Sequence, residues 1–168
     1  MRESGRRALT LETRAGLLAA HAEGDLVTVD MGPARLDWRE IPLREPCDTL
    51  HLALGAGPLA DPVAVSMGNP HAVFLVPDAE AIPLAELGPR LEHHPLFPQR
   101  TNVEVVQVLA PDRLRMRVWE RGVGITQACG TGACAAVVAA ARRGVAAHRA
   151  EVMLDGGSLT IEWRPDHH

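Results

Sequence analysis

The sequence of 168 residues contains no lysine and no tyrosine, and its seventeen basic side chains are all arginine. Without lysine the chain offers no amine for a pyridoxal Schiff base and no P-loop lysine for a nucleotide phosphate. We interpret the excess of arginine and alanine as a preference for GC-rich codons. Such a preference also depletes asparagine, so the two that remain, Asn69 and Asn102, become candidates for a functional role. The alternative for each is a turn residue that tolerates unusual backbone angles.

Long apolar runs and paired cysteines are also missing. The longest uncharged apolar stretch, residues 133–141, is far short of the ~20 residues that a membrane span needs, and no export signal opens the chain. Three cysteines without a framework spacing are typical of a reducing cytosol, so we expect a cytoplasmic protein. The net charge of −4 provides no basic stripe. We therefore expect neither a nucleic-acid partner nor a membrane.

The hydrophobic pattern predicts a mixed α+β chain made mainly of short strands. Residues 84–93 have helical spacing and stop before Pro95, and residues 32–48, rich in proline, glycine and charge, are typical of a connector. Pro111 and Asp112 mark a hairpin turn. The strands are predicted at 8–13, 15–20, 26–31, 49–54, 63–67, 72–76, 103–109, 114–119, 151–154 and 158–163.

The stretch QACGTGACAAVVAAARRG, residues 127–144, predicts a second helix. Its residues 133–141 are apolar on every face, so the helix must be enclosed by other elements. Two arginines followed by Gly144 form a C-terminal pattern that suits the helix dipole. Cys134, in the middle of this helix, is interpreted as core packing, and Cys47, in the connector, as incidental.

The first turn of this helix predicts a site for an anion beside a thiol. Thr131 is a suitable N-cap, and Gly130 and Gly132 leave backbone N–H groups open to a carboxylate or phosphate. Cys129 lies just outside this turn, where the positive end of the dipole favours the thiolate. The alternative is an inert buried cysteine, the commonest fate of that residue type.

A second polar motif is SMGNPH, residues 66–71, between two apolar strands. Pro70 keeps Asn69 out of the helical region and stiffens the bend, so the side chains of Asn69 and His71 are held at a fixed angle. The alternative is an ordinary strand-connecting turn with a satisfied histidine.

A third motif, WERGVG, residues 119–124, ends a strand. In the functional interpretation its glycines bend the chain so that Glu120 and Arg121 both line a pocket. In the alternative they are a solvated pair at a loop entrance. Asn102, in the TNV sequence that opens another strand, supplies a further polar group.

The segments MGNPHAV, TNVEVV, ERGVGITQACGTGACA and GGSLTIEW, in this order, resemble the diaminopimelate epimerases over essentially the entire chain. The resemblance implies an α+β fold, with a barrel of mixed strands around a central buried helix and a partial second barrel. It also implies a cofactor-independent isomerase that interconverts LL- and meso-diaminopimelate in lysine biosynthesis. In this family one cysteine thiolate removes the α-proton while a second thiol delivers a proton to the opposite face.

The same resemblance assigns the site residues. Cys129 is implied as one of the two bases, Glu120 as a contact of that thiol and of the substrate amine, and His71 as the partner of the other cysteine. The remaining positions are implied to bind substrate, the distal end through Asn69, Asn102 and Arg121, and the reacting carboxylate through the N–H groups of Gly130 and Thr131. No metal ligand and no cofactor is implied.

The chain departs from the family in two respects. Ile125 stands where the family usually has a glutamate. The family also has a preceding segment that carries the second cysteine, and we expect the chain to begin after it. Residues 1–32 with 156–168 are then the remnant of an N-terminal barrel with exposed apolar edges, and residues 33–155 the C-terminal barrel. As partners besides the small-molecule substrate, we expect either a second copy of the chain or the missing N-terminal segment.

Other functions remain open from the residues alone. Cys129, His71 and an asparagine are also the parts of a cysteine hydrolase or acyltransferase. The chain is alternatively a remnant that binds a carboxylate without turnover. A zinc site is not expected, because Cys129 and Cys134 are not spaced as in a ribbon or finger.

Overall fold

The computed structural model describes residues 8–13, 16–24 and 26–164. The chain divides into two compact units, Met1–Pro33 and Ala34–His168. The first unit is a three-stranded antiparallel sheet of β1 (Ala8–Thr13), β2 (Gly16–Glu23) and β3 (Leu26–Val29). Leu17, Leu26 and Val27 are exposed on it, and the interpretation of residues 1–32 as the remnant of an N-terminal barrel stays a prediction.

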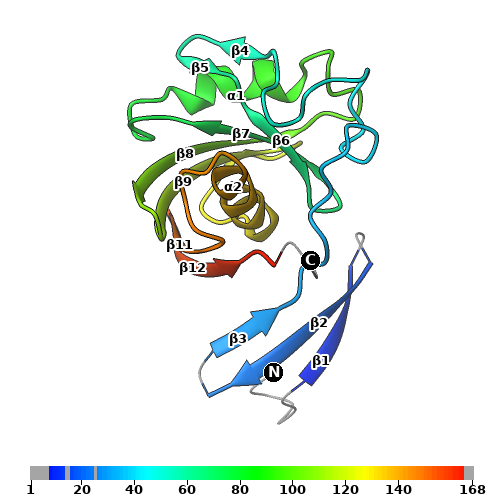
Figure 1. Ribbon diagram of the computed structural model, residues 1–168, viewed down its shortest axis with the longest axis vertical. Coiled ribbons are helices and arrows are strands. Elements are labelled where there is room, and N and C mark those ends of the chain that lie inside the picture. Colours follow the sequence, from blue (N-terminus) through cyan, green and yellow to red (C-terminus); the bar gives the residue numbers. More distant parts are fainter. Residues whose placement is uncertain (1–7, 14–15, 25, 165–168) are drawn as a thin grey trace. The chain divides into compact units, whose positions relative to one another are not determined.

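The second unit is built on a mixed sheet in the strand order β12-β11-β9-β8-β7-β6, with β10 paired to β9 (Figure 1). Two neighbouring pairs, β7 with β8 and β9 with β11, are parallel, and the other pairs are antiparallel. The strands are β6 (Val63–Ser66), β7 (Pro70–Leu75), β8 (Asn102–Ala110), β9 (Arg113–Glu120), β10 (Gly124–Thr126), β11 (Arg149–Leu154) and β12 (Gly157–Glu162).

The helix α2 (Gly130–Arg142) lies inside the curve of this sheet (Figure 1). It packs against β6, β7, β8, β9, β11 and β12. Its residues at 133 and 135–140 are buried, because alanine side chains let the surrounding strands approach closely. The helix ends as predicted: Gly144 has φ of +68°, and the N–H of Val145 donates to Ala140 O at 3.0 Å. The expected central buried helix is confirmed.

The opposite face of the sheet carries a second layer. It contains α1 (Leu84–Glu92), the short hairpin of β4 (Gly55–Ala56) and β5 (Leu59–Ala60), and the connector. Side chains alternate along each strand, so Phe74 and Val105 face this layer while His71 and Glu104 face α2. The core of this layer consists of Ile41, Leu43, Leu52, Leu54, Leu59, Ala64, Ala72, Phe74, Ala79, Ile82, Leu84, Leu87, Leu91, Phe97, Val103 and Val105.

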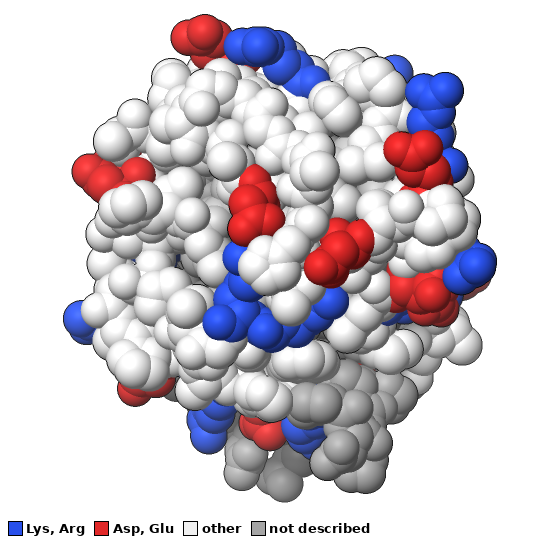
Figure 2. All heavy atoms as spheres, turned by 45° about the horizontal axis from the view of Figure 1, so that its top comes forward, with Lys and Arg blue, Asp and Glu red and all other residues white. Residues whose placement is uncertain are grey.

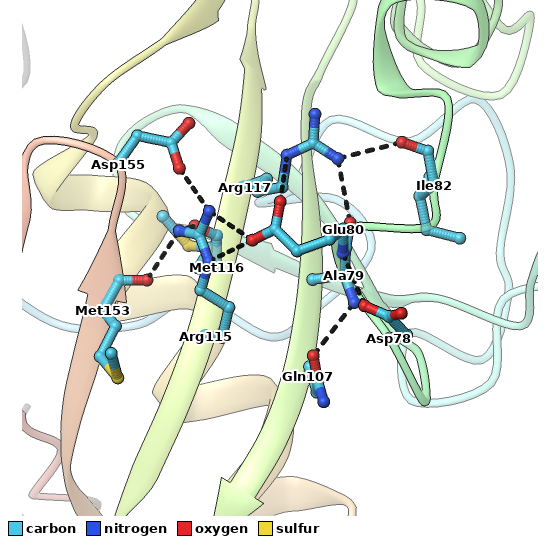
Figure 3. Close-up of polar contacts among 10 residues, drawn as sticks. All are labelled: Asp78, Ala79, Glu80, Ile82, Gln107, Arg115, Met116, Arg117, Met153 and Asp155. Carbon is cyan, nitrogen blue, oxygen red and sulfur yellow. Dashed lines mark hydrogen bonds and ion pairs between the residues drawn. The ribbon is translucent and has the colours of Figure 1, made fainter.

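Two arginines on β9 attach the loop before α1 to the sheet (Figure 3). The Arg115 guanidinium pairs with Glu80 at 2.7 Å and with Asp155 in the turn after β11. Arg117 donates to the carbonyl oxygens of Ala79 and Ile82, both at 3.0 Å. Because both guanidinium groups are mostly buried, these charge-assisted bonds fix the loop before α1 more firmly than exposed pairs would.

On the face shown in Figure 2, acidic and basic side chains lie beside one another in small groups. Broad uncharged areas separate these groups. No helix in the described part of the chain is long and apolar enough to cross a membrane.

Two expectations about the elements need correction, and the shortest strands were not predicted. Residues 49–54 form no strand; their alternation arises because Leu52 and Leu54 pack into the core. The short strand β10 has too few residues to show a period and was not predicted. Residues 156–164 were expected to join residues 1–32, but β12 forms a hairpin with β11, in register from Leu154↔Gly157 to Arg149↔Glu162. The tight turn at residues 155–156 places them in the second unit.

Candidate active site

Cys129 is the N-cap of α2. Its backbone is extended, with φ −140° and ψ 107°, and its Sγ accepts a hydrogen bond from Gly132 N at 3.4 Å. The prediction that Thr131 caps the helix was wrong, because the helix already begins at Gly130. The hydroxyl of Thr131 instead lies 3.6 Å from Cys129 Sγ. The thiol therefore lies at the amino end of an enclosed helix.

The backbone N–H groups beside this sulfur are free to bind an anion. No acceptor within residues 8–13, 16–24 and 26–164 is bonded to the N–H of Gly130 or Thr131. Gly130 is exposed, and a Cβ at that position would meet nothing within 4 Å. N–H groups at the start of a helix carry partial positive charge and favour carboxylate or phosphate oxygens.

The environment of Cys129 stabilises the thiol and not the thiolate. Burial, followed by the negative charges of Glu104 and Glu120, raises the pKa of Cys129 to about 11, although the hydrogen bonds from Thr131 and Gly132 act in the opposite direction. The prediction of a pKa lowered by the helix terminus was therefore wrong. Burial disfavours the charged form of a thiol, and it is the largest of the causes that set the pKa of Cys129.

Asn69, His71 and Thr131 form a continuous line of contacts that reaches this thiol. His71 Nε2 lies 3.0 Å from Asn69 Oδ1, and Asn69 Nδ2 donates to Thr131 Oγ1 at 3.4 Å. The SMGNPH turn thus brings Asn69 to the amino end of α2. His71 itself contacts Asn69 and Glu104, and no bond between His71 and Cys129 is present in the described chain.

Glu104 was not predicted as a site residue. It is fully buried on β8 and faces α2, with its Oε1 2.7 Å from His71 Nδ1. A Cβ at position 132 would lie 3.0 Å from Glu104 Oε1 and 3.2 Å from Cys129 Sγ, so Gly132 allows the carboxyl group to lie under the first turn of α2. The available signal was a glutamate inside the apolar run VEVV, since a fully buried carboxylate is rare without a partner.

Asn102 is bonded to the backbone of Arg121 in the turn at residues 120–122, which we call the ERG turn. Asn102 Oδ1 accepts from Arg121 N at 2.8 Å, and its Nδ2 donates to Pro70 O at 3.0 Å. The amide of Asn102 therefore connects the SMGNPH turn to the ERG turn. The Arg121 side chain is exposed and donates to Gln99 O at 2.9 Å.

Glu120 ends β9 near Cys129. It accepts a hydrogen bond from the hydroxyl of Thr126 on β10, and its charge is among those that raise the pKa of Cys129. Ile125 pairs with Trp119 across β9 and β10 and is exposed. The carboxylates near the thiol are thus Glu104 and Glu120.

The other two cysteines lie elsewhere. Cys47 packs against the core on the α1 side of the sheet, and Cys134 is half-buried on α2. In the described part of the chain, no three His, Cys, Asp or Glu side chains lie close enough together to hold a metal ion. A hollow of about 530 Å³ lies at the other end of β8 and β9, beside Asp112 and Arg149, and contains none of the predicted site residues.

The structure therefore brings together most of the predicted residues. Asn69, Thr131 and Cys129 are in contact, Asn102 holds the backbone of Arg121, and His71 and Asn102 are register partners on the adjacent strands β7 and β8.

Comparison with known sequences gives close relatives. The diaminopimelate epimerase of Rhodospirillum centenum is 64% identical over 166 residues, which cover 98% of this chain and 57% of that protein. That of Phenylobacterium zucineum is 58% identical over 173 residues, covering 100% of this chain and 62% of that protein. The chain thus spans less than two thirds of the length of these relatives.

Two solved structures share the fold. A hydroxyproline epimerase from Agrobacterium vitis, with bound trans-4-hydroxy-L-proline, superposes with a TM-score of 0.62 at 18% identity, over 91% of this chain and 50% of that one. A probable proline racemase from Agrobacterium radiobacter superposes with a TM-score of 0.61 at 18% identity, over 94% and 52%. The sequence model of the family described as Diaminopimelate epimerase matches residues 63–168, more than half of the chain. The chain belongs to the diaminopimelate epimerase family.

Proposed function

We propose that this protein takes part in the interconversion of LL- and meso-diaminopimelate, the isomerase reaction of its family in lysine biosynthesis, with Cys129 as one of the two proton-transfer groups. The observation that carries the proposal is the position of Cys129 Sγ at the amino end of α2, beside the free N–H groups of Gly130 and Thr131. Negative charge grows on the carboxylate when an α-carbon loses its proton, and N–H donors already in place stabilise that charge.

The raised pKa of Cys129 decides which proton transfer this residue performs first. Near neutral pH its sulfur carries a proton, so Cys129 acts as the acid that delivers a proton to the α-carbon. A second sulfur, as thiolate, takes the α-proton from the opposite face. One C–H bond breaks and one forms, one S–H bond forms and one breaks, and the total charge of the pair is unchanged.

The second sulfur belongs, in this proposal, to the part of the family that these 168 residues do not span. Cys47 lies on the far side of the sheet from α2, and Cys134 is within the helix, so neither faces Cys129 across a substrate. The 57% share of the Rhodospirillum centenum enzyme that this chain covers leaves room for such a residue. The part of the family that these residues do not span would complete the site.

Two sets of residues would bind the two ends of the substrate. The N–H groups of Gly130 and Thr131 would hold the reacting carboxylate, and Glu120 would contact the α-amine. Arg121 can grip the distal carboxylate bidentately, since its guanidinium is exposed. Asn69 would bind that end directly, whereas Asn102, whose amide is bonded to Pro70 and Arg121, would position the ERG turn.

A cysteine hydrolase with a Cys129–His71 pair is not favoured. Both ring nitrogens of His71 face other groups, Glu104 Oε1 at 2.7 Å and Asn69 Oδ1 at 3.0 Å. The histidine is therefore unavailable as a base for the thiol. An acyl-enzyme burst with an activated ester would contradict this conclusion.

Exchange of the α-proton of diaminopimelate isomers in D₂O tests the proposal. We expect exchange when the chain is combined with the part of the family that it does not span, and little or none from the 168 residues alone. Cys129→Ser should abolish the exchange, because a serine hydroxyl is too weak an acid and base. Cys47→Ser, on the other face of the sheet, is the matched control and should retain it. No exchange by the complete protein would reject the assignment.

A further inference from the structure

Glu104 and His71 form a fully buried hydrogen-bonded pair directly behind the candidate active site. Both side chains have 0% exposure, and Nδ1 and Oε1 are 2.7 Å apart. They come from the adjacent parallel strands β7 and β8. Glu104 is paired in register with Val73, which is two residues after His71 on β7. A carboxylate and an imidazole are costly to bury unless each has a partner, so the pair requires an explanation beyond packing.

The partners of the imidazole determine where its protons lie. Asn69 Oδ1, 3.0 Å from Nε2, is an acceptor only, because the amide nitrogen of Asn69 points to Thr131 Oγ1. Nε2 therefore carries a hydrogen. The bond between Nδ1 and the carboxyl group holds one further proton, on the nitrogen or on the oxygen. In either arrangement the pair is neutral as a whole and Nε2 remains a donor.

This donor sets the orientation of Asn69. With its oxygen held by His71, the amide of Asn69 presents its NH₂ group to Thr131 and to the amino end of α2. If Nε2 lacked its hydrogen, the amide would turn over and present its oxygen there instead. A carboxylate ligand is attracted by an NH₂ group and repelled by an amide oxygen.

We propose that Glu104 is a positioning residue that acts through His71 to fix the amide of Asn69 as a donor for a substrate carboxylate. The inference rests on the proposed function for the identity of the ligand, but the arrangement of the three side chains is independent of it. Glu104 does not touch the substrate; its effect reaches the ligand only through His71 and Asn69.

Nitrogen-15 spectra of histidine-labelled protein test the arrangement without substrate. We expect the His71 Nε2 resonance to be that of a protonated nitrogen coupled to its hydrogen. Replacement of Asn69 by alanine should shift this resonance, and replacement of the distant Cys47 by serine should not. An unprotonated Nε2 in the wild-type protein would overturn the inference, whatever the turnover.

Steady-state kinetics of the complete protein test the effect on the ligand. Glu104→Leu should raise KM for diaminopimelate about tenfold, the loss of one hydrogen bond, with a smaller change in kcat. The double variant with Glu104→Leu and Asn69→Ala should have a KM only slightly above that of Asn69→Ala alone, since both changes act on the same donor. Glu92 is another buried carboxylate, and it does not contact Asn69. The effect of Glu92→Gln on KM should therefore add to that of Asn69→Ala.

Full additivity of Glu104→Leu with Asn69→Ala would overturn the positioning role. Should the leucine variant fail to fold, Glu104→Gln retains the volume and the same double-mutant test applies to it. A protonated Nε2 with no exchange of diaminopimelate protons would reject the proposed function and leave the inference about Glu104 standing.

Discussion

The carboxylate of Glu92 on α1 accepts a hydrogen bond from the indole N–H of Trp119 on β9 at 2.7 Å. Its other oxygen accepts from the backbone N–H of Gly122 at 2.9 Å and lies 3.6 Å from the Arg100 guanidinium. A single buried side chain thus holds the end of β9 and the ERG turn against α1. The candidate site therefore depends on the layer behind the sheet as well as on α2.

Glu92→Gln should destabilise the protein at neutral pH by about 1–3 kcal/mol, because bonds to a buried charged acceptor are replaced by weaker ones. Burial alone would raise the pKa of Glu92, but the bonds from Trp119 and Gly122 and the charges of His93 and Arg100 lower it from 4.5. The stabilisation is therefore complete above the unfolded pKa and is lost as the pH falls through the folded one. Urea unfolding at pH 7 and pH 3 measures the difference.

The matched control is Glu86→Gln on the exposed face of the same helix, which should change the free energy of unfolding by less than about 0.5 kcal/mol. The difference between wild type and Glu92→Gln should shrink in acid. An equal difference at both pH values would contradict the assigned role of the charge.

Gly88→Ala should destabilise the protein although alanine is the better helix former. A Cβ at position 88 would lie 2.5 Å from Trp119 Cδ2, so the indole must move away from α1. We expect a net loss of about 1–3 kcal/mol in thermal or urea unfolding, the cost of overpacking. Gly130→Ala is the contrast, since its Cβ would meet nothing within 4 Å, and it should be neutral or slightly stabilising. Equal effects at the two positions would contradict the packing argument.

Much of this architecture could be predicted from the sequence. The alternation in residues 103–109 and 114–119 and the Pro111-Asp112 turn correspond to β8, β9 and their hairpin. The small side chains after Cys129 indicated an enclosed helix because no amphipathic face was present. These signals are local and come from side-chain periodicity, which the backbone preserves when tertiary packing agrees with it.

The remainder depended on contacts between distant segments. Nothing in residues 49–54 tells packing of alternate leucines into a core from pairing in a sheet. The bond between Glu104 and His71 joins residues 33 positions apart, and the raised pKa of Cys129 results from burial by strands that a local pattern does not reveal. The position of the thiol at the helix terminus was predicted correctly, but the direction in which its pKa is shifted was not.

Ala139→Leu should strongly destabilise the protein, by 2 kcal/mol or more on the order-of-magnitude scale of overpacked cores. Ala139 has 0% exposure within α2, which strands enclose on most sides, so three added carbon atoms have no space. Differential unfolding against wild type measures the loss. Ala147→Leu, at an exposed position after the helix, should have little effect, and a similar loss at both positions would show that α2 is not tightly enclosed.

Alkylation of Cys129 should be slow near neutral pH and should accelerate until the pH approaches about 11, the raised pKa of this thiol. Burial is the main cause, with the charges of Glu104 and Glu120 acting in the same direction. At pH 8 the thiolate fraction should be about a hundredfold lower than for a thiol with the ordinary value of 9.0. The rate with iodoacetamide is measured on a variant in which Cys47 and Cys134 are serine, so that only Cys129 reacts.

The same variant in concentrated urea is the control for the folded environment. Unfolding removes the burial, so its alkylation midpoint should return to the ordinary range of a free thiol. Because the folded pKa is the higher one, the thiol contributes stability below the unfolded pKa, and this contribution is lost as the pH rises toward 11. A midpoint below 9 in the folded protein would mean that the helix terminus outweighs burial, and Cys129 would then act as the resting base of the proposed reaction.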